Sequence, residues 1–310
     1  MAINKAVRAA LSILSYPEID VKKTYLVERE MQKLLSRRLK NPSLYRVWEQ
    51  PVLSGVHNVP VRIFRPAGTP GASLLLFFHG GGWVTGTVDS YDGVCADMAA
   101  MTGCTVASVD YRLAPEHRFP AAPEDCYAAA QEVFRRAETL GVEPENVVLI
   151  GDSAGGNLAA AVSLMSRDRG GFRPSRQILI YPALASDHSE NSPYPSVREN
   201  GTGYLLTARR VRDYMTLYRS SDEDLTNPYF APLHAASLGE QPDTLLITAE
   251  YCPLRDEGEA YGRRLREAGG SVEIHRIPDA LHGYFSLPVR FSQVKRTYEI
   301  INRFLETRHE

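Results

Sequence analysis

The chain has 310 residues, and 44% of them are hydrophobic, which is enough for one large α/β domain with an ordinary core. Its formal net charge of −2 and its pI of about 6.5 lack the basic excess expected of a nucleic-acid-binding protein. The four cysteines are scattered and form no CxxC pair, which argues against a zinc site and against a disulfide framework. We therefore expect reduced, mostly buried thiols in a cytosolic (cytoplasmic) protein.

The first residues predict an amphipathic helix, because Ile3, Val7, Leu11 and Leu14 recur at helical spacing. The uninterrupted apolar run in this region is shorter than the ~7–15 residues that the core of a signal peptide needs. No segment approaches ~20 consecutive apolar residues, so we expect neither a membrane-spanning helix nor a membrane partner.

After Pro60 the chain alternates between apolar, strand-like runs and helical patterns, which predicts a mostly parallel sheet with helices on both faces. The expected strands are 61–66, 73–79, 105–111, 146–152, 176–182, 243–249 and 272–278, with helices at 122–140 and 154–167 among others. Residues 1 to about 45 and about 186–240 do not follow this alternation. We expect both segments to form a cap over the ligand-binding edge of a single domain that spans 1–310.

The strongest motif is GDSAGG at 151–156, directly after the predicted strand NVVLI and directly before a predicted helix. G-x-S-x-G in this context is a nucleophile elbow, whose tight turn holds the serine in a strained backbone conformation. Small residues at 151, 155 and 156 let the strand and the helix approach each other. Ser153 is therefore the candidate nucleophile, presented at the carboxyl edge of the sheet.

A second motif, HGGGW at 79–83, follows another predicted strand. Consecutive glycines let backbone N–H groups point at a developing oxyanion. We expect the donors to be the N–H groups of Gly81, Gly82 and Ala154, while His79 orients the loop. The base that a serine nucleophile needs is His282, in DALHGY after the last predicted strand, because the order serine then histidine suits this fold.

The motifs HGGGW, DYRLAPEHRFPAA (110–122), GDSAGGNLA (151–159), PLRDEG (253–258) and LHGY together resemble the hormone-sensitive-lipase-like family of α/β-hydrolases, the bacterial family IV esterases. The resemblance covers about residues 60–305 with the motifs in the family's order. It implies the α/β-hydrolase fold, with a mostly parallel sheet of about eight strands and a helical cap. It also implies hydrolysis of short-chain carboxylic esters through an acyl-enzyme, without a metal or cofactor, and frequent homodimers. Trp83 and Tyr284 flank the expected catalytic groups, and each either lines the substrate pocket or packs in the core.

One position departs from the family pattern. The family places its triad acid at the first position of D-P-L, and this chain has Cys252 there. A free thiol is mostly neutral at pH 7 and is a weak substitute for a carboxylate. Asp256 ranks first as a replacement, because a side chain in the first turn of a helix leans back toward its N-terminus. A triad without a carboxylate, using water or Cys252, ranks close behind, and Glu250 ranks last.

Two functions follow from these observations. The first is a serine esterase that acts on small-molecule esters, with Ser153, His282 and Asp256 as catalytic residues. The second is an attenuated or non-catalytic relative that binds a small molecule in the same pocket. The retention of both Ser153 and His282 favours the first.

Overall fold

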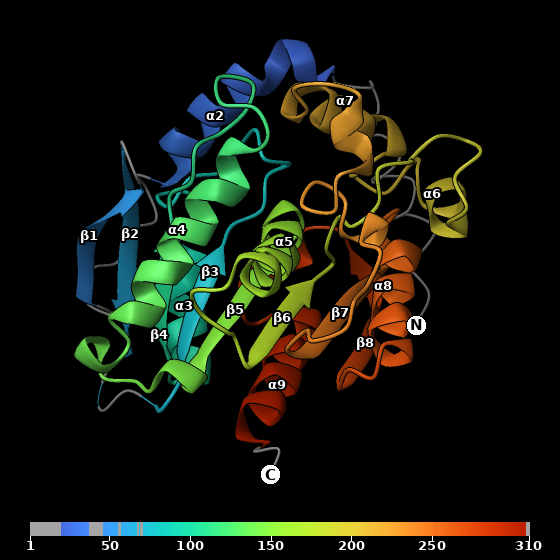
Figure 1. Cartoon of the computed structure of the whole chain (residues 1–310). Coiled ribbons are helices and arrows are strands. Elements are labelled where there is room, and N and C mark those ends of the chain that lie inside the picture. The colour runs from blue at the N-terminus through green and yellow to red at the C-terminus, as the bar shows by residue number, and fades with distance from the viewer. Residues whose placement is uncertain (1–19, 37–45, 55–56, 67, 69–70, 308–310) are drawn as a thin grey trace.

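The computed structural model describes residues 20–36, 46–54, 57–66, 68 and 71–307. The amphipathic helix expected around Ile3–Leu14 lies outside the described residues, as do the other parts of the expected N-terminal cap segment at 15–19 and 37–45. Within the described chain, eight strands form one sheet in the order β1-β2-β4-β3-β5-β6-β7-β8 (Figure 1). The strands are β1 (Arg46–Ser54), β2 (His57–Arg65), β3 (Leu74–Phe78), β4 (Thr105–Val109), β5 (Val147–Asp152), β6 (Arg176–Ile180), β7 (Asp243–Tyr251) and β8 (Val272–Leu281).

The six strands from β4 to β8 in this order run parallel, whereas β2 is antiparallel to both β1 and β4. All residues of β3, β4 and β5 are buried, which explains why these strands read as unbroken apolar runs in the sequence. The α/β fold class and the seven predicted strands are confirmed. The strand β1 was missed because its sequence, RVWEQPVLS, shows neither an unbroken apolar run nor a strict alternation and contains Pro51. Its place at the edge of the sheet explains why a proline is tolerated there.

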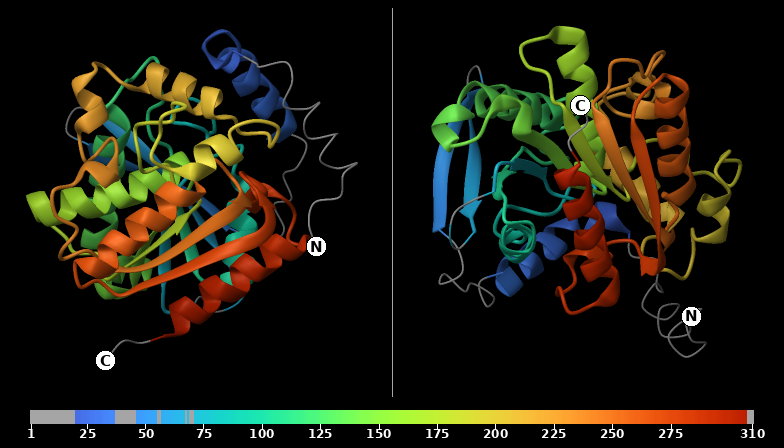
Figure 2. Two further views of the ribbon diagram at one scale, coloured as in Figure 1. Left: turned by 90° about the vertical axis from the view of Figure 1, so that its right-hand side faces the viewer. Right: turned by 90° about the horizontal axis from the view of Figure 1, so that it is seen from below.

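Helices cover both faces of the sheet, with α4, α5 and α8 on one face and α3 and α9 on the other (Figure 2). The helices are α2 (Val21–Ser36), α3 (Asp92–Thr102), α4 (Ala121–Arg135), α5 (Ala154–Arg169), α6 (Pro195–Glu199), α7 (Ala208–Tyr218), α8 (Arg255–Glu267) and α9 (Ser292–Glu306). Short 3₁₀ helices span Glu138–Leu140, Pro144–Asn146, Glu223–Thr226, Pro232–His234 and Tyr284–Ser286. This arrangement buries the apolar strands on both sides.

Helices α2 and α7 lie side by side above the carboxyl ends of the parallel strands (Figure 1). Polar contacts join them: Lys22 Nζ lies 3.2 Å from a carboxylate oxygen of Asp213, and the Tyr214 hydroxyl donates to Glu28 over 3.3 Å. They come from the two segments that do not follow the strand–helix alternation. The two segments therefore meet over the same edge of the sheet.

The register of the sheet brings two pairs of loops together at this edge. Phe78 at the end of β3 is the partner of Gly151 on β5, so the glycine-rich loop emerges beside the turn that carries Ser153. Beyond a bulge at Ala249–Tyr251, Tyr251 on β7 is the partner of Leu281 on β8. Positions 252 and 282, the next residues along these parallel strands, therefore emerge side by side.

Candidate active site

Ser153 occupies the turn between β5 and α5, with φ 56° and ψ −118°. A positive φ is unusual for a residue other than glycine, so the strained turn predicted from the sequence is confirmed. The tightness of the turn is visible at its glycines. A Cβ at Gly151 would overlap the carbonyl of Gly155, and a Cβ at Gly155 would overlap the carbonyl of Phe78. Only glycine at these positions lets β5, β3 and α5 approach closely enough to hold the serine in place.

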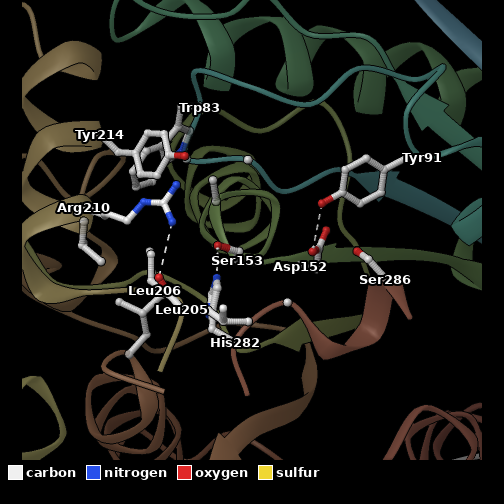
Figure 3. Close-up of a pocket in the computed structure, with 17 residues that line it drawn as sticks. Trp83, Tyr91, Asp152, Ser153, Leu205, Leu206, Arg210, Tyr214, His282 and Ser286 are labelled. Carbon is white, nitrogen blue, oxygen red and sulfur yellow. Dashed lines mark hydrogen bonds between the residues drawn. The ribbon is translucent and has the colours of Figure 1, made fainter. Parts of the chain in front are cut away.

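His282 lies beside the candidate nucleophile, with its Nε2 2.9 Å from Ser153 Oγ (Figure 3). The ring follows β8 directly and packs against Tyr181 with ring centroids 4.8 Å apart. Burial lowers the pKa of His282 to about 3. The imidazole is therefore neutral at neutral pH, which is the form that accepts a proton from a serine hydroxyl.

The other ring nitrogen of His282 faces a thiol. Cys252 Sγ lies 3.1 Å from His282 Nδ1, and the backbone N–H of Leu254 donates to the same sulfur over 3.4 Å. Cys252 is fully buried, and burial raises the pKa of its thiol, so the sulfur is uncharged at neutral pH. The structure thus places Ser153, His282 and Cys252 in one line of contacts without a carboxylate at its end.

Asp256 does not take the position expected for a triad acid. Its Oδ2 accepts from the backbone N–H of Ser196 over 2.7 Å, and its Oδ1 accepts from Arg255 Nε over 2.7 Å. The Ser196 hydroxyl in turn accepts from the Asp256 N–H over 3.1 Å, so this residue joins α8 to α6. The expectation that Asp256 leans toward position 252 is corrected by these contacts, because α6 offers it hydrogen bonds on another side.

Glu250, the third candidate acid, acts on the backbone of the histidine segment. Its Oε2 accepts from the N–H of Asp279 over 2.7 Å, within the last residues of β8 before His282. Asp279 has a φ of 55°, so this hydrogen bond holds a bent stretch of chain. Glu250 therefore supports the segment that carries His282 rather than its ring.

The glycine-rich loop is held by buried groups around it. The His79 ring stacks on Tyr111 with centroids 4.3 Å apart, and the Tyr111 hydroxyl donates to the His79 carbonyl over 2.7 Å. Burial lowers the pKa of His79 to about 4, which leaves this ring neutral. Gly81, Gly82 and Ala154, the three expected oxyanion donors, all line the cavity beside Ser153. His79 lies behind this loop, as expected for an orienting residue.

Asp152 is a buried acid at the site that motif reading passed over, although it lies between Gly151 and Ser153. Its Oδ1 accepts from the Gly80 N–H over 2.8 Å, and its Oδ2 accepts from the hydroxyls of Tyr91 and Tyr181 over 3.2 and 3.4 Å. Burial raises the pKa of Asp152 to about 7. This carboxyl therefore ties the glycine-rich loop to the elbow.

The cavity above Ser153 has a volume of about 250 Å³. Trp83 lines it while its ring stacks on Tyr218 at 4.5 Å, so this residue is both a wall and part of the core. Tyr284 is buried on the other side, where its hydroxyl lies 2.7 Å from Thr297 Oγ1. Of the two alternatives left open for Tyr284, the structure therefore shows core packing, and its place as a substrate-binding residue is corrected. Sequence reading also missed Arg210 and Tyr214 of α7, which line the cavity (Figure 3).

A family model described as alpha/beta hydrolase fold matches residues 75–286, more than half of the chain. The chain belongs to the hormone-sensitive-lipase-like family of α/β-hydrolases. Among the family relatives, an arylesterase of Saccharolobus solfataricus is 33% identical over 269 residues, which cover 86% of each chain. An ethyl acetate hydrolase of Pseudomonas putida is 35% identical and covers 74% of this chain and 73% of its own.

Solved structures agree with this family assignment. A hyperthermophilic esterase from the archaeon Pyrobaculum calidifontis has a TM-score of 0.86 and 35% identity, and covers 99% of this chain and 98% of its own. The α/β-hydrolase fold expected from the motifs is therefore confirmed. None of the described helices has the length and apolar character needed to cross a membrane.

Proposed function

We propose that this carboxylic-ester hydrolase cleaves short-chain esters through an acyl-enzyme on Ser153, with the Cys252 thiol in the place of the family's triad carboxylate. The observation that carries the proposal is the contact of 2.9 Å between Ser153 Oγ and His282 Nε2 beside the glycine-rich loop. The cavity of about 250 Å³ supports a small substrate, because it lies just below the ~300 Å³ at which drug-sized ligand pockets begin.

In the first half-reaction Ser153 Oγ attacks the carbonyl carbon of the ester while His282 Nε2 takes the hydroxyl proton. The carbonyl oxygen becomes an oxyanion, which accepts hydrogen bonds from the backbone N–H groups of Gly81, Gly82 and Ala154. Collapse of this intermediate expels the alcohol, which receives the proton from His282. Water then attacks the acyl-enzyme in the same way and releases the carboxylic acid and free Ser153.

Cys252 changes one element of this mechanism. To accept the serine proton at Nε2, His282 must carry its own proton on Nδ1, and a carboxylate enforces this tautomer by accepting from Nδ1–H. A neutral thiol accepts weakly from Nδ1–H, and in the other tautomer its S–H donates to Nδ1. It also carries no charge that would stabilise the imidazolium formed after proton transfer. We therefore expect turnover below that of a triad with a carboxylate.

The same neutral thiol is the observation that favours the second candidate, an attenuated or non-catalytic relative that binds a small molecule without turning it over. Hydrolysis of p-nitrophenyl acetate and p-nitrophenyl butyrate by the purified protein and by Ser153→Ala decides between them. Activity that is lost in Ser153→Ala supports the esterase. No Ser153-dependent release of p-nitrophenol would support the binding protein instead.

Two further expectations belong to this proposal. We infer that α2, α6 and α7 belong to a cap that closes the cavity from above, because α2 and α7 meet over it.

The four cysteines are all free and buried, which supports a protein that acts in a reducing compartment such as the cytosol. The homodimer implied by the family resemblance stays a prediction.

A further inference from the structure

Arg210 of α7 brings a positive charge to the active-site cavity. It is the single arginine or lysine among the described residues that line this cavity, and its guanidinium points toward Ser153 (Figure 3). Tyr91, Asp152 and Ser286 line the opposite side of the nucleophile. The cavity is therefore cationic at one end, and the established chemistry of the serine does not need that charge.

The contacts of Arg210 are long and incomplete. Its Nη2 lies 3.3 Å from Glu28 Oε1, and its Nη1 lies 3.4 Å from the Leu205 carbonyl. Its Nε is buried and has no hydrogen-bond partner within the part of the chain that the structure describes. Charge-assisted hydrogen bonds are ordinarily about 2.7–2.9 Å long, so these donors are weakly used.

Structural arginines elsewhere in the molecule behave differently. Arg112 holds Asp125 through two contacts of 2.8 and 2.7 Å, and Arg29 holds Glu116 through contacts of 2.8 and 3.0 Å. Each of these pairs is bidentate, the geometry that arginine prefers with a carboxylate. Arg210 meets Glu28 through a single long contact, which leaves most of its donors available to another anion.

The surroundings of Arg210 strengthen its interaction with a bound anion. Leu205, Leu206 and Val211 line the same cavity, and only 26% of the Arg210 side chain is exposed. A cation that is partly removed from water between apolar side chains gains more from a bound carboxylate than an exposed one does. Glu28, on α2, neutralises part of the charge and competes with such a ligand.

We propose that Arg210 selects esters that carry a carboxylate group, bound by its guanidinium while the ester carbonyl lies at Ser153. The inference rests on the proposed function and names its substrate class. The carboxylate lies on the acyl part in half-esters of dicarboxylic acids and on the alcohol part in acyl esters of hydroxy acids. Both present the same anion to Arg210, and the experiment separates them.

The kinetic test compares each anionic ester with a neutral ester in which an isopropyl group replaces the carboxylate. Monoethyl glutarate represents the acyl side, and the acetate ester of γ-hydroxybutyrate represents the alcohol side. The measured quantity is the ratio of kcat/KM for the anionic ester to kcat/KM for its neutral partner. Hydrolysis of each ester is measured by pH-stat titration at neutral pH. In the wild-type protein this ratio exceeds one for at least one pair, and that pair identifies the side.

Three variants and a matched control test the residue. Arg210→Gln lowers the ratio by about 10- to 100-fold, as expected for the loss of a hydrogen-bonded ion pair, and Arg210→Lys restores part of it. Glu28→Gln raises the ratio, because it removes the competing carboxylate. The control is Arg209→Gln, the same change at the neighbouring position of α7, where the side chain is exposed and faces another surface; it leaves the ratio unchanged.

A purely structural role for Arg210, as a link between α7 and α2, predicts a different result. In that case Arg210→Gln lowers kcat/KM for anionic and neutral esters equally, and Glu28→Gln does the same. This outcome overturns the inference, as does a wild-type ratio at or below one for both pairs.

Binding to a protein without the nucleophile separates this inference from the proposed function. Isothermal titration of Ser153→Ala with each anionic ester is expected to show, for at least one of them, binding that weakens by about 10- to 100-fold when Arg210→Gln is added. Equal binding with and without Arg210 overturns the inference even if the wild-type protein hydrolyses neutral esters. Arg210-dependent binding supports it even if turnover by the wild-type protein is absent.

Discussion

Cys252 Sγ lies 3.1 Å from His282 Nδ1, on the side of the imidazole opposite the Nε2 that contacts Ser153 Oγ at 2.9 Å. We propose that the thiol takes the place from which a carboxylate would orient the ring. Because the β7 and β8 strands bring positions 252 and 282 side by side, this contact follows from the fold itself. The two ring nitrogens of His282 therefore contact a hydroxyl and a thiol, and the thiol is uncharged at neutral pH.

We predict that Cys252→Asp raises kcat/KM for p-nitrophenyl butyrate by at least about tenfold, because loss of a triad acid costs up to ~10⁴-fold. The carboxylate accepts from Nδ1–H and stabilises the imidazolium that forms after proton transfer. The matched control is Cys252→Asn. Asparagine has nearly the same size as aspartate but no charge, so this variant is expected to gain little in kcat/KM. Equal rates for Cys252→Asp and the wild-type protein would show that the charge is not what limits turnover.

The pH profile of kcat/KM is expected to change in the same variant. His282 acts as a base only when neutral, and its pKa of about 3 keeps it neutral down to strongly acidic pH. His282 therefore contributes no loss of wild-type activity between about pH 7 and pH 5. A carboxylate at position 252 raises the pKa of His282, so Cys252→Asp loses activity as the pH falls through this range. Superimposable acid limbs in the two proteins would contradict this prediction.

Asp256→Asn is expected to affect stability rather than catalysis. At neutral pH it weakens the contacts with Ser196 and Arg255, and we expect a loss of about 1 kcal/mol in the free energy of unfolding. Burial raises the pKa of Asp256, but the hydrogen bonds from Arg255 and from the Ser196 N–H, together with the charge of Arg255, lower it by more. The net shift of this pKa is therefore downward. The difference between the proteins therefore shrinks as the pH falls through this lowered pKa. Urea unfolding measures it, and a large drop in kcat would restore Asp256 as the triad acid.

Glu250→Ala is expected to lower kcat by about threefold to thirtyfold with little change in KM, because it releases the Asp279 N–H that holds the segment before His282. Glu250→Gln keeps an amide oxygen that accepts this hydrogen bond, and it should retain most of the activity. Steady-state kinetics with p-nitrophenyl butyrate distinguish the two variants. Full activity in Glu250→Ala would mean that the segment holds its shape without this contact.

Gly155→Ala is expected to destabilise the protein by about 3 kcal/mol or more, or to prevent folding, because the new methyl group overlaps the Phe78 carbonyl. Gly93→Ala is the matched control. Gly93 is an exposed residue of α3 with no atom within 4 Å of the added carbon. There the change should stabilise the helix by about 0.5–1 kcal/mol. Urea unfolding compares the two, and a Gly155→Ala protein with wild-type stability would refute the packing explanation.

Local sequence predicted the parts of the site that depend on short-range geometry. A serine between small residues at a strand–helix junction needs a turn that only glycines allow. Ser153 and its elbow could therefore be predicted from GDSAGG. The three glycines of HGGGW and the late His282 could also be predicted from the sequence, because each follows a predicted strand. The strand β1 could not be predicted in this way, because its sequence has no alternating pattern and contains Pro51.

The fold class, which the structure confirms, and the candidate nucleophile and base could be predicted from the sequence alone, because apolar periodicity and steric limits on backbone turns act over a few residues. Which group faces Nδ1 of His282 depends on the folded chain, because it follows from the pairing of Tyr251 with Leu281 across β7 and β8. Only in the folded chain does Asp256 turn to Ser196 on α6, and Arg210 of α7 point into the cavity. These directions are set by hydrogen bonds and packing between segments far apart in the chain, and no local pattern encodes them.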